Sequence, residues 1–179
     1  MIELPLETRR LRVRPFRPGQ DAAAMHELWG DPEAMRFVPG SLQQSLEGTR
    51  ARLARTLKQG RDGFGFWALE LRESGRLVGA VGLFPLGWEG PEIELAYHIV
   101  PSAWNQGYAS EAGGALLEAA WRETELDRVV AVALPENRAS TRVMEKLGLT
   151  YEGPERYRGF DVVRYSIGRP PMASPQASL

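Results

Sequence analysis

The sequence contains no cysteine and only two histidines, His26 and His98, among its 179 residues. The lack of cysteine excludes disulfides, thiolate metal sites and a cysteine nucleophile. Two histidines do not make a histidine-rich metal site, so we expect no metal. No apolar run approaches the ~20 residues that a membrane-spanning helix needs, and Met1–Leu11 lacks the apolar core of a signal peptide. We therefore predict a cytoplasmic protein without a membrane partner.

Neither sign of charge is in excess, because the sequence has 22 basic and 23 acidic residues and a formal net charge of −1. A domain that binds nucleic acid is usually clearly basic, so we expect no direct nucleic-acid partner. The arginines at positions 9, 10, 12, 14 and 17 leave an RNA-contacting alternative open. We interpret them as a solvated strand face with neighbouring acidic partners.

What is present fits one domain, since a domain takes roughly 100–200 residues. Apolar residues alternate at period 2 in some segments and recur at helical spacing in others. We predict a single α/β domain over residues 1–167 and a disordered, proline-containing tail over residues 168–179.

The predicted strands and helices alternate along the chain. The strands are expected at Arg10–Phe16, Phe64–Arg72, Leu77–Leu86, Glu92–Val100, Arg128–Leu134, Leu149–Arg156 and Asp161–Ile167. The helices are expected after an Asp21 N-cap, at Pro32–Val38, from a Ser41-x-x-Gln44 capping box to Gly60, at Gly107–Thr124 and at Asn137–Leu147.

The segment from Glu92 to Glu111 predicts an anion site where a strand is followed by a turn and a helix. The first amides of that helix have no intrahelical partner and lie at the positive end of its dipole. These amides belong to Gln106, Gly107, Tyr108, Ala109 and Ser110. Gly107 has no Cβ and Ala109 only a methyl group, so a bulky anion can approach. The alternative is that both residues only allow close packing on the sheet.

A second informative segment runs from Leu134 to Gly148. Asn137 is placed as an N-cap, and Ser140 shares a largely apolar helix face with Met144. A buried hydroxyl needs a partner. Either Ser140 bonds back to a carbonyl of its own turn, or Asn137 and Ser140 face a ligand between this helix and the sheet.

Together these motifs resemble the GNAT superfamily of acetyl-CoA-dependent N-acetyltransferases, and within it the branch of ribosomal-protein N-terminal alanine acetyltransferases. The likeness runs from about Leu6 to Ile167 and rests on three groups of residues. They are Glu94-Leu95-Ala96-Tyr97, Pro101 with Trp104-Asn105-Gln106-Gly107-Tyr108-Ala109-Ser110-Glu111, and Asn137-x-x-Ser140-x-x-Val143-Met144-Glu145-Lys146-Leu147-Gly148.

The resemblance implies a mixed, mostly antiparallel sheet of six to seven strands, flanked by helices. Its central strands, Glu92–Val100 and Arg128–Leu134, are expected to be parallel and to splay apart. It also implies acetyl-CoA as co-substrate. The pyrophosphate would lie on the amides of residues 106–110, the backbone of Ile99 and Val100 would border the cofactor, and Asn137 and Ser140 would face the pantetheine arm.

The implied reaction is acetyl transfer to a primary amine within a ternary complex, with a protein N-terminus or a small-molecule amine as acceptor. We predict Glu94 as the general base and His98, which has the same strand parity, as its runner-up. A backbone amide near Ile99 would meet the oxyanion. A salt-bridged carboxylate and a structural histidine are the simpler alternatives. Glu89, Glu92 and Glu94 hint at an acidic cleft, which would favour cationic amines.

Two residues depart from the family pattern. Trp104 stands where many relatives begin the phosphate loop with Arg or Gln. Met144 stands where other branches have a tyrosine that protonates the leaving thiolate, which makes Ser140 the best remaining acid and Tyr151 a weaker one. Met144 also leaves open a non-catalytic acyl-CoA-binding regulatory module. Trp88, in the loop at residues 85–91, leaves a homodimer contact open.

Overall fold

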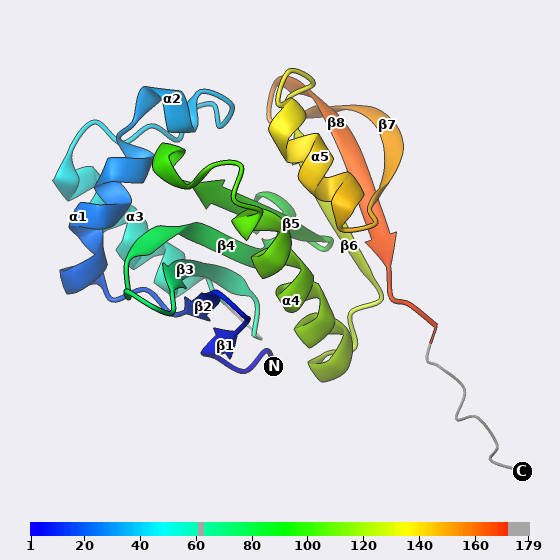
Figure 1. Ribbon diagram of the computed structural model, residues 1–179. Helices are drawn as coiled ribbons and strands as arrows, with labels where there is room; N and C mark the ends of the chain where they lie inside the picture. The colour runs from blue at the N-terminus through cyan, green and yellow to red at the C-terminus, as the bar shows by residue number, and fades with distance from the viewer. Residues whose placement is uncertain (61–62, 172–179) are drawn as a thin grey trace, which may run out of the picture.

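The computed structural model describes residues 1–60 and 63–171, which form one twisted eight-stranded sheet covered by helices on both faces (Figure 1). The strand order is β1-β2-β3-β4-β5-β6-β8-β7. The strands are β1 (Leu6–Glu7), β2 (Leu11–Arg14), β3 (Gly65–Leu71), β4 (Leu77–Pro85), β5 (Ile93–Ile99), β6 (Arg128–Ala133), β7 (Thr150–Tyr157) and β8 (Phe160–Gly168).

The helices divide between the two faces of the sheet. They are α1 (Pro18–Trp29), α2 (Pro32–Met35), α3 (Leu46–Gln59), α4 (Tyr108–Glu123) and α5 (Arg138–Lys146), with short 3₁₀ turns η1 (Leu86–Trp88) and η2 (Pro101–Ala103). One apolar cluster joins α1 and α3 to the sheet, and a second joins α4 and α5 to the opposite face. Side chains that alternate along β5 therefore reach different layers.

The predicted sheet type is confirmed: neighbouring strands are antiparallel except for the β5–β6 pair, which is parallel. The structure has eight strands where six to seven were expected. The additional strand, β1, has two residues and pairs Leu6 with Val13 and Glu7 with Arg12. Two residues are too few to produce a detectable hydrophobic alternation.

Two predicted helix starts were wrong. α1 begins at Pro18, whose fixed φ suits the first helical position, and Asp21 is a buried residue of its first turn. α3 begins after Ser45, whose side chain accepts from the Gly48 N–H, and not at a Ser41-x-x-Gln44 box. Both errors have one cause: polar capping residues are frequent near helix starts, and their type alone does not identify which one caps.

The N-terminal arginines have acidic partners, as predicted, but Arg14 is buried and not solvated. Its guanidinium contacts Asp21 at 2.8 Å and Glu70 at 2.7 Å. Arg12 also contacts Glu70, and Arg10 pairs with Glu111 at 2.6 Å. These pairs account for three of the five arginines that had left an RNA-contacting surface open.

The C-terminal strand continues past the predicted domain boundary. β8 includes Gly168, and Arg169 donates hydrogen bonds to the carbonyls of Leu126 and Trp121. The predicted boundary at residue 167 is therefore too early, because these partners lie some 45 residues away in the sequence. The rest of the predicted tail, residues 172–179, lies outside the described residues.

Candidate active site

The central parallel strands separate toward their carboxyl ends. β5 and β6 are aligned at Glu94 and Val130. Farther along, residues 95–98 of β5 and 132–134 at the end of β6 line opposite sides of a pocket. The backbone of β5 stays in continuous register with β4 from Ile93 to Ile99, so the opening lies on its β6 edge. The predicted splayed pair therefore forms a gap in the sheet.

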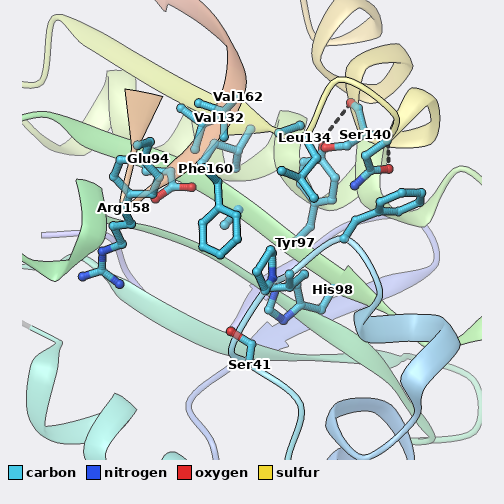
Figure 2. Close-up of a pocket in the computed structure, with 18 of the residues that line it drawn as sticks. Ser41, Glu94, Tyr97, His98, Val132, Leu134, Ser140, Arg158, Phe160 and Val162 are labelled. Carbon is cyan, nitrogen blue, oxygen red and sulfur yellow. Dashed lines mark hydrogen bonds between the residues drawn. The ribbon is translucent and has the colours of Figure 1, made fainter. Parts of the chain in front are cut away.

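The pocket in this gap has a volume of about 230 Å³ and takes residues from both faces of the sheet. Glu94 and His98 come from the β5 face that packs toward α1 and α3, together with Phe37, Pro39 and Ser41 from the α2–α3 connection. Tyr97 comes from the opposite face, where α5 supplies Asn137, Ser140 and Met144. Figure 2 shows Glu94 at one end of this pocket and Ser140 at the other.

Glu94 has the electrostatic properties of a base that works near neutral pH. Burial raises the pKa of its carboxyl from 4.5 to about 7, while the backbone N–H of Gly87 and the positive charge of Arg158 oppose that rise. A carboxylate whose pKa matches the operating pH accepts a proton readily and gives it up again. The pocket therefore contains one carboxyl suited to proton transfer.

His98 is held in a way that argues against a base. The indole N–H of Trp29 donates to its Nδ1 at 3.1 Å, so that lone pair is occupied and the neutral ring carries its proton on Nε2. Burial and the nearby Arg52 charge lower the pKa of His98 to about 3. A base this weak removes a proton from an amine poorly. Sequence parity could not reveal this, because Trp29 is 69 residues away.

Ser140 is hydrogen-bonded to Tyr97, a partner that the sequence did not indicate. The phenol of Tyr97 donates to the Ser140 carbonyl at 2.9 Å and lies 3.0 Å from the Ser140 hydroxyl. Asn137 caps α5, as predicted, by accepting from the Ser140 N–H at 3.2 Å. Burial raises the pKa of Tyr97 well above its usual value, so the phenol stays protonated and orients Ser140. Tyr97 and Glu94 have opposite parity along β5, so the sequence did indicate that Tyr97 points to the other face of the sheet from Glu94.

The start of α4 carries the features of the predicted anion site. Gly107 is its N-cap in a left-handed conformation, with φ at 79°, and has no side chain to occupy the free amides. The helix proper starts at Tyr108, one residue later than predicted. Residues 105–107 are exposed, and Tyr108, Ala109 and Ser110 are half-buried. The guanidinium of Arg10, which is paired with Glu111, lies over the Tyr108 ring at 4.7 Å.

The end of β5 is fixed by Trp104. Its indole N–H donates to the Ile99 carbonyl at 2.7 Å, so this departure from the family pattern braces the loop. The Val100 N–H donates to Val78 on β4 at 2.9 Å and is not free for a ligand. Successive N–H groups along a strand point to alternate edges of that strand. Since the Val100 N–H points to β4, the N–H groups of Tyr97 and Ile99 point to the opposite edge of β5, toward the gap.

The aromatic residues near the sheet divide between the pocket and the two cores. Phe37 lines the pocket, whereas Trp29, Trp67 and Phe84 are buried in the two cores. Trp88 stacks on Phe84 with ring centroids 4.4 Å apart, so it covers the sheet. The β7–β8 hairpin adds four pocket residues that were not predicted as site residues, Tyr157, Arg158, Phe160 and Val162. Tyr151 is half exposed beside Tyr165 and lies outside the pocket.

Other kinds of site are not found in the described residues. Across residues 1–60 and 63–171, no three His, Asp or Glu side chains gather in a way that would hold a metal ion. Within the same ranges, no helix has both the length and the apolar composition needed to cross a bilayer.

Comparison with known proteins finds relatives along most of this chain. Residues 10–150 match the family described as the acetyltransferase (GNAT) domain. YoaA of Bacillus subtilis (strain 168), named as an uncharacterized N-acetyltransferase, is 30% identical over 173 residues, which span 92% of this chain and 97% of that protein.

Solved structures agree. A GNAT-family acetyltransferase from Bacillus anthracis superposes with a TM-score of 0.79 at 28% identity, over 92% of this chain and 98% of that one. RimL, a ribosomal L7/L12 alpha-N-protein acetyltransferase solved with coenzyme A, superposes with a TM-score of 0.76 at 21% identity, over 92% and 97% of the two chains. The second likeness is one of fold.

Proposed function

Because this chain belongs to the GNAT acetyltransferase family and is an acyltransferase, we propose that it moves the acetyl group of acetyl-CoA to a primary amine within one ternary complex. The observation that carries the proposal is the pocket between β5 and β6, which is lined from both faces of the sheet. Acetyl-CoA would enter from the α4–α5 side, and the amine from the side of Glu94 and Phe37.

The residues on the α4–α5 side fit a long ligand with phosphates at one end. The free amides that start α4 supply positive potential for a pyrophosphate. Asn137 and Ser140, which line the pocket, would face the pantetheine arm. When bound, acetyl-CoA supplies the activated acyl carbon in the gap.

The chain's own residues move protons and stabilise charge during the transfer. Glu94 takes a proton from the amine, whose nitrogen forms a bond to the acyl carbon. The N–H groups of Tyr97 and Ile99, which point into the gap, are placed to stabilise negative charge on the acyl oxygen. Ser140 gives its proton to the sulfur as the carbon–sulfur bond breaks, and Ser140 is restored when the proton that Glu94 took up returns to it through solvent. The nitrogen loses one proton, and the sulfur gains one, so the products are an amide and a thiol.

Other assignments remain proposals of ours. The acceptor is either a protein N-terminus or a small-molecule amine, and the location is the cytoplasm. The competing function is a non-catalytic acyl-CoA-binding module, which Met144 favours because a thioether cannot donate a proton and its side chain is only 1% exposed.

Cofactor binding is tested by thermal unfolding with acetyl-CoA, free CoA and ATP. A ligand at 100 times its Kd adds about 2.7 kcal/mol, which is a rise in Tm of roughly 5–11 °C for a chain of this size. We expect both CoA forms to raise Tm and ATP not to. No rise with either CoA form, in a folded sample, would contradict the proposal.

The variant Ala109→Asp tests whether phosphates lie at the start of α4. A carboxylate there favours the helix, because it faces the positive end of the dipole, but it repels a phosphate. We expect the Tm without ligand to hold or rise and CoA affinity to fall at least tenfold, less so at high salt. Ala109→Asn, a neutral side chain of the same shape, is the control and should bind CoA much better. Equal affinities would place the phosphates elsewhere.

The Tyr97–Ser140 pair gives a second test. With Ser140→Ala, no hydroxyl meets the leaving sulfur, and we expect kcat to fall roughly tenfold, because a thiolate of pKa near 8.5 already leaves fairly well. Tyr97→Phe should cause a smaller loss, because Ser140 remains but is no longer oriented. Ser140→Thr, which keeps the hydroxyl, should retain most of kcat. Steady-state kinetics with saturating acetyl-CoA decide, and a Ser140→Ala enzyme of full activity would remove Ser140 from the mechanism.

A further inference from the structure

Arg158 differs from the other arginines of the β7–β8 hairpin. Arg156 pairs with Asp161 at 2.8 Å, and Arg164 pairs with Glu92, Glu152 and Glu155 at 2.5–3.0 Å. Arg158 has Glu89 at 3.9 Å, and the side chain of Glu89 is 86% exposed. An exposed contact this long contributes little. Arg158 is therefore without a close ion pair among the described residues, and the other carboxylate on which its charge acts is Glu94.

This cation lies in the pocket, beside the proposed base. Arg158 lines the pocket, and Figure 2 shows it next to Glu94 at one end. Its guanidinium donates to the Gly87 carbonyl, and the N–H of the same residue faces Glu94. Gly87 is buried, so this shared residue fixes the cation and the carboxylate side by side.

The backbone at Arg158 supports a role beyond that of a turn residue. Tyr157 pairs with Phe160 across the hairpin, so Arg158 and Gly159 are the two central residues of the turn. Both have positive φ, 49° and 86°, and such turns prefer Asn-Gly. Arginine is less favourable than asparagine in this left-handed position. We therefore infer that position 158 carries arginine because of what its side chain does.

The neighbouring acids do not make the pocket acidic, contrary to the hint in the sequence. Glu92 is paired with Arg128 and Arg164, and Glu89 is exposed. Glu94 remains, with Arg158 at its side. A purely cationic amine would therefore meet the Arg158 guanidinium beside the Glu94 carboxylate. A molecule that carries both an amine and a carboxylate would complement the pair.

We propose that the acceptor is an α-amino acid with a free carboxylate, which binds Arg158 and thereby places the amine at Glu94. The amine and the carboxylate of an α-amino acid are attached to one carbon and therefore lie close together. Arg158 and Glu94 also lie close together, because both contact Gly87. A guanidinium binds a carboxylate through two parallel hydrogen bonds, so it would orient the amine as well as bind it. This inference rests on the proposed transferase function.

The test compares acceptors that differ only in the carboxylate. Thiol release from acetyl-CoA is measured with a panel of free amino acids, with the corresponding amino acid amides, and with tripeptides that begin with the same residues. We expect kcat/KM for the best free acid to exceed that for its amide and its tripeptide at least tenfold. Equal or better rates with amides, tripeptides or diamines would overturn the inference and leave the transferase intact. Thiol release with no amine at all would overturn both.

Three variants connect the preference to Arg158. Arg158→Asn suits the turn, so the protein should fold, but we expect the preference for acid over amide to fall to near one, mainly through KM. Arg158→Lys keeps a cation and should retain part of the preference. Arg156→Asn, which removes the neighbouring arginine of the hairpin, is the control and should keep all of it. An Arg158→Asn enzyme that prefers free acids as strongly as the wild type would overturn the inference.

Discussion

The enzyme with Glu94→Gln should lose 10²–10⁴-fold in kcat, which is the usual contribution of a positioned general base. Glutamine keeps the shape of the side chain but cannot accept the proton of the amine. In the wild type, kcat/KM calculated for the neutral form of the amine should rise with pH and level off above about 7, because Glu94, whose pKa is about 7, must first lose its own proton. In the variant this rise should disappear.

Stability separates this loss of activity from misfolding. The folded pKa of Glu94 lies above the usual 4.5, so ionisation of the buried carboxyl costs stability as pH rises from about 4.5 to 7 and the full cost remains above pH 7. Each pKa unit is worth about 1.4 kcal/mol, so Glu94→Gln should be more stable than the wild type at pH 8, by up to about 3 kcal/mol, and no more stable at pH 4. Denaturant unfolding at both pH values measures the difference.

The control for this experiment is Glu92→Gln, which lies two residues earlier in the chain and outside the pocket. Its carboxylate pairs with Arg128 and Arg164, so we expect a modest loss of stability and kcat within a few-fold of the wild type. If both variants were equally active, or if the pH dependence survived in Glu94→Gln, Glu94 would not be the base.

The second large effect concerns stability alone. Arg14→Met should reduce the free energy of unfolding by about 3–5 kcal/mol, because it leaves the buried Asp21 without a cation and the buried Glu70 with Arg12 alone. Arg14, Asp21 and Glu70 are all about 5% exposed or less. Arg14 makes two hydrogen bonds to Asp21, at 2.8 and 2.9 Å, and one to Glu70. For a chain of this size the loss is a fall in Tm of roughly 6–20 °C.

An exposed ion pair separates the effect of burial from the effect of losing a charge pair. Arg36→Met is the control. It breaks an exposed pair, Arg36 with Glu33, and should change stability by less than about 1 kcal/mol. A large loss in both variants, or in neither, would contradict the importance of burial here.

The predictable part of this protein is its local part. The Asn137 cap and the open helix start at Gly107 could be inferred because each depends on residues within one turn. The parallel pair and the position of Glu94 beside the thioester came instead from the resemblance to the family.

The part that could not be predicted depends on contacts between distant segments. Trp29 removes His98 from consideration, and Tyr97 reaches Ser140 across 43 residues. Arg158 reaches Gly87 across 71 residues. The neighbouring sequence gives no signal for such pairs, since the same residue types occur on ordinary strands and turns. For this reason the cofactor side could be outlined from the sequence, whereas the acceptor side could not.

The most direct test of the account asks for acetyl transfer without an acetylated enzyme. Wild-type protein is mixed with acetyl-CoA, alone and with a panel of amines, and thiol release is measured together with the mass of the intact protein. We predict thiol release only when an amine is present, an equal amount of acetylated amine, and an unchanged protein mass. Acetyl-CoA that binds but releases no thiol with any amine, or a protein that becomes acetylated before the amine is added, would contradict transfer through the gap between β5 and β6.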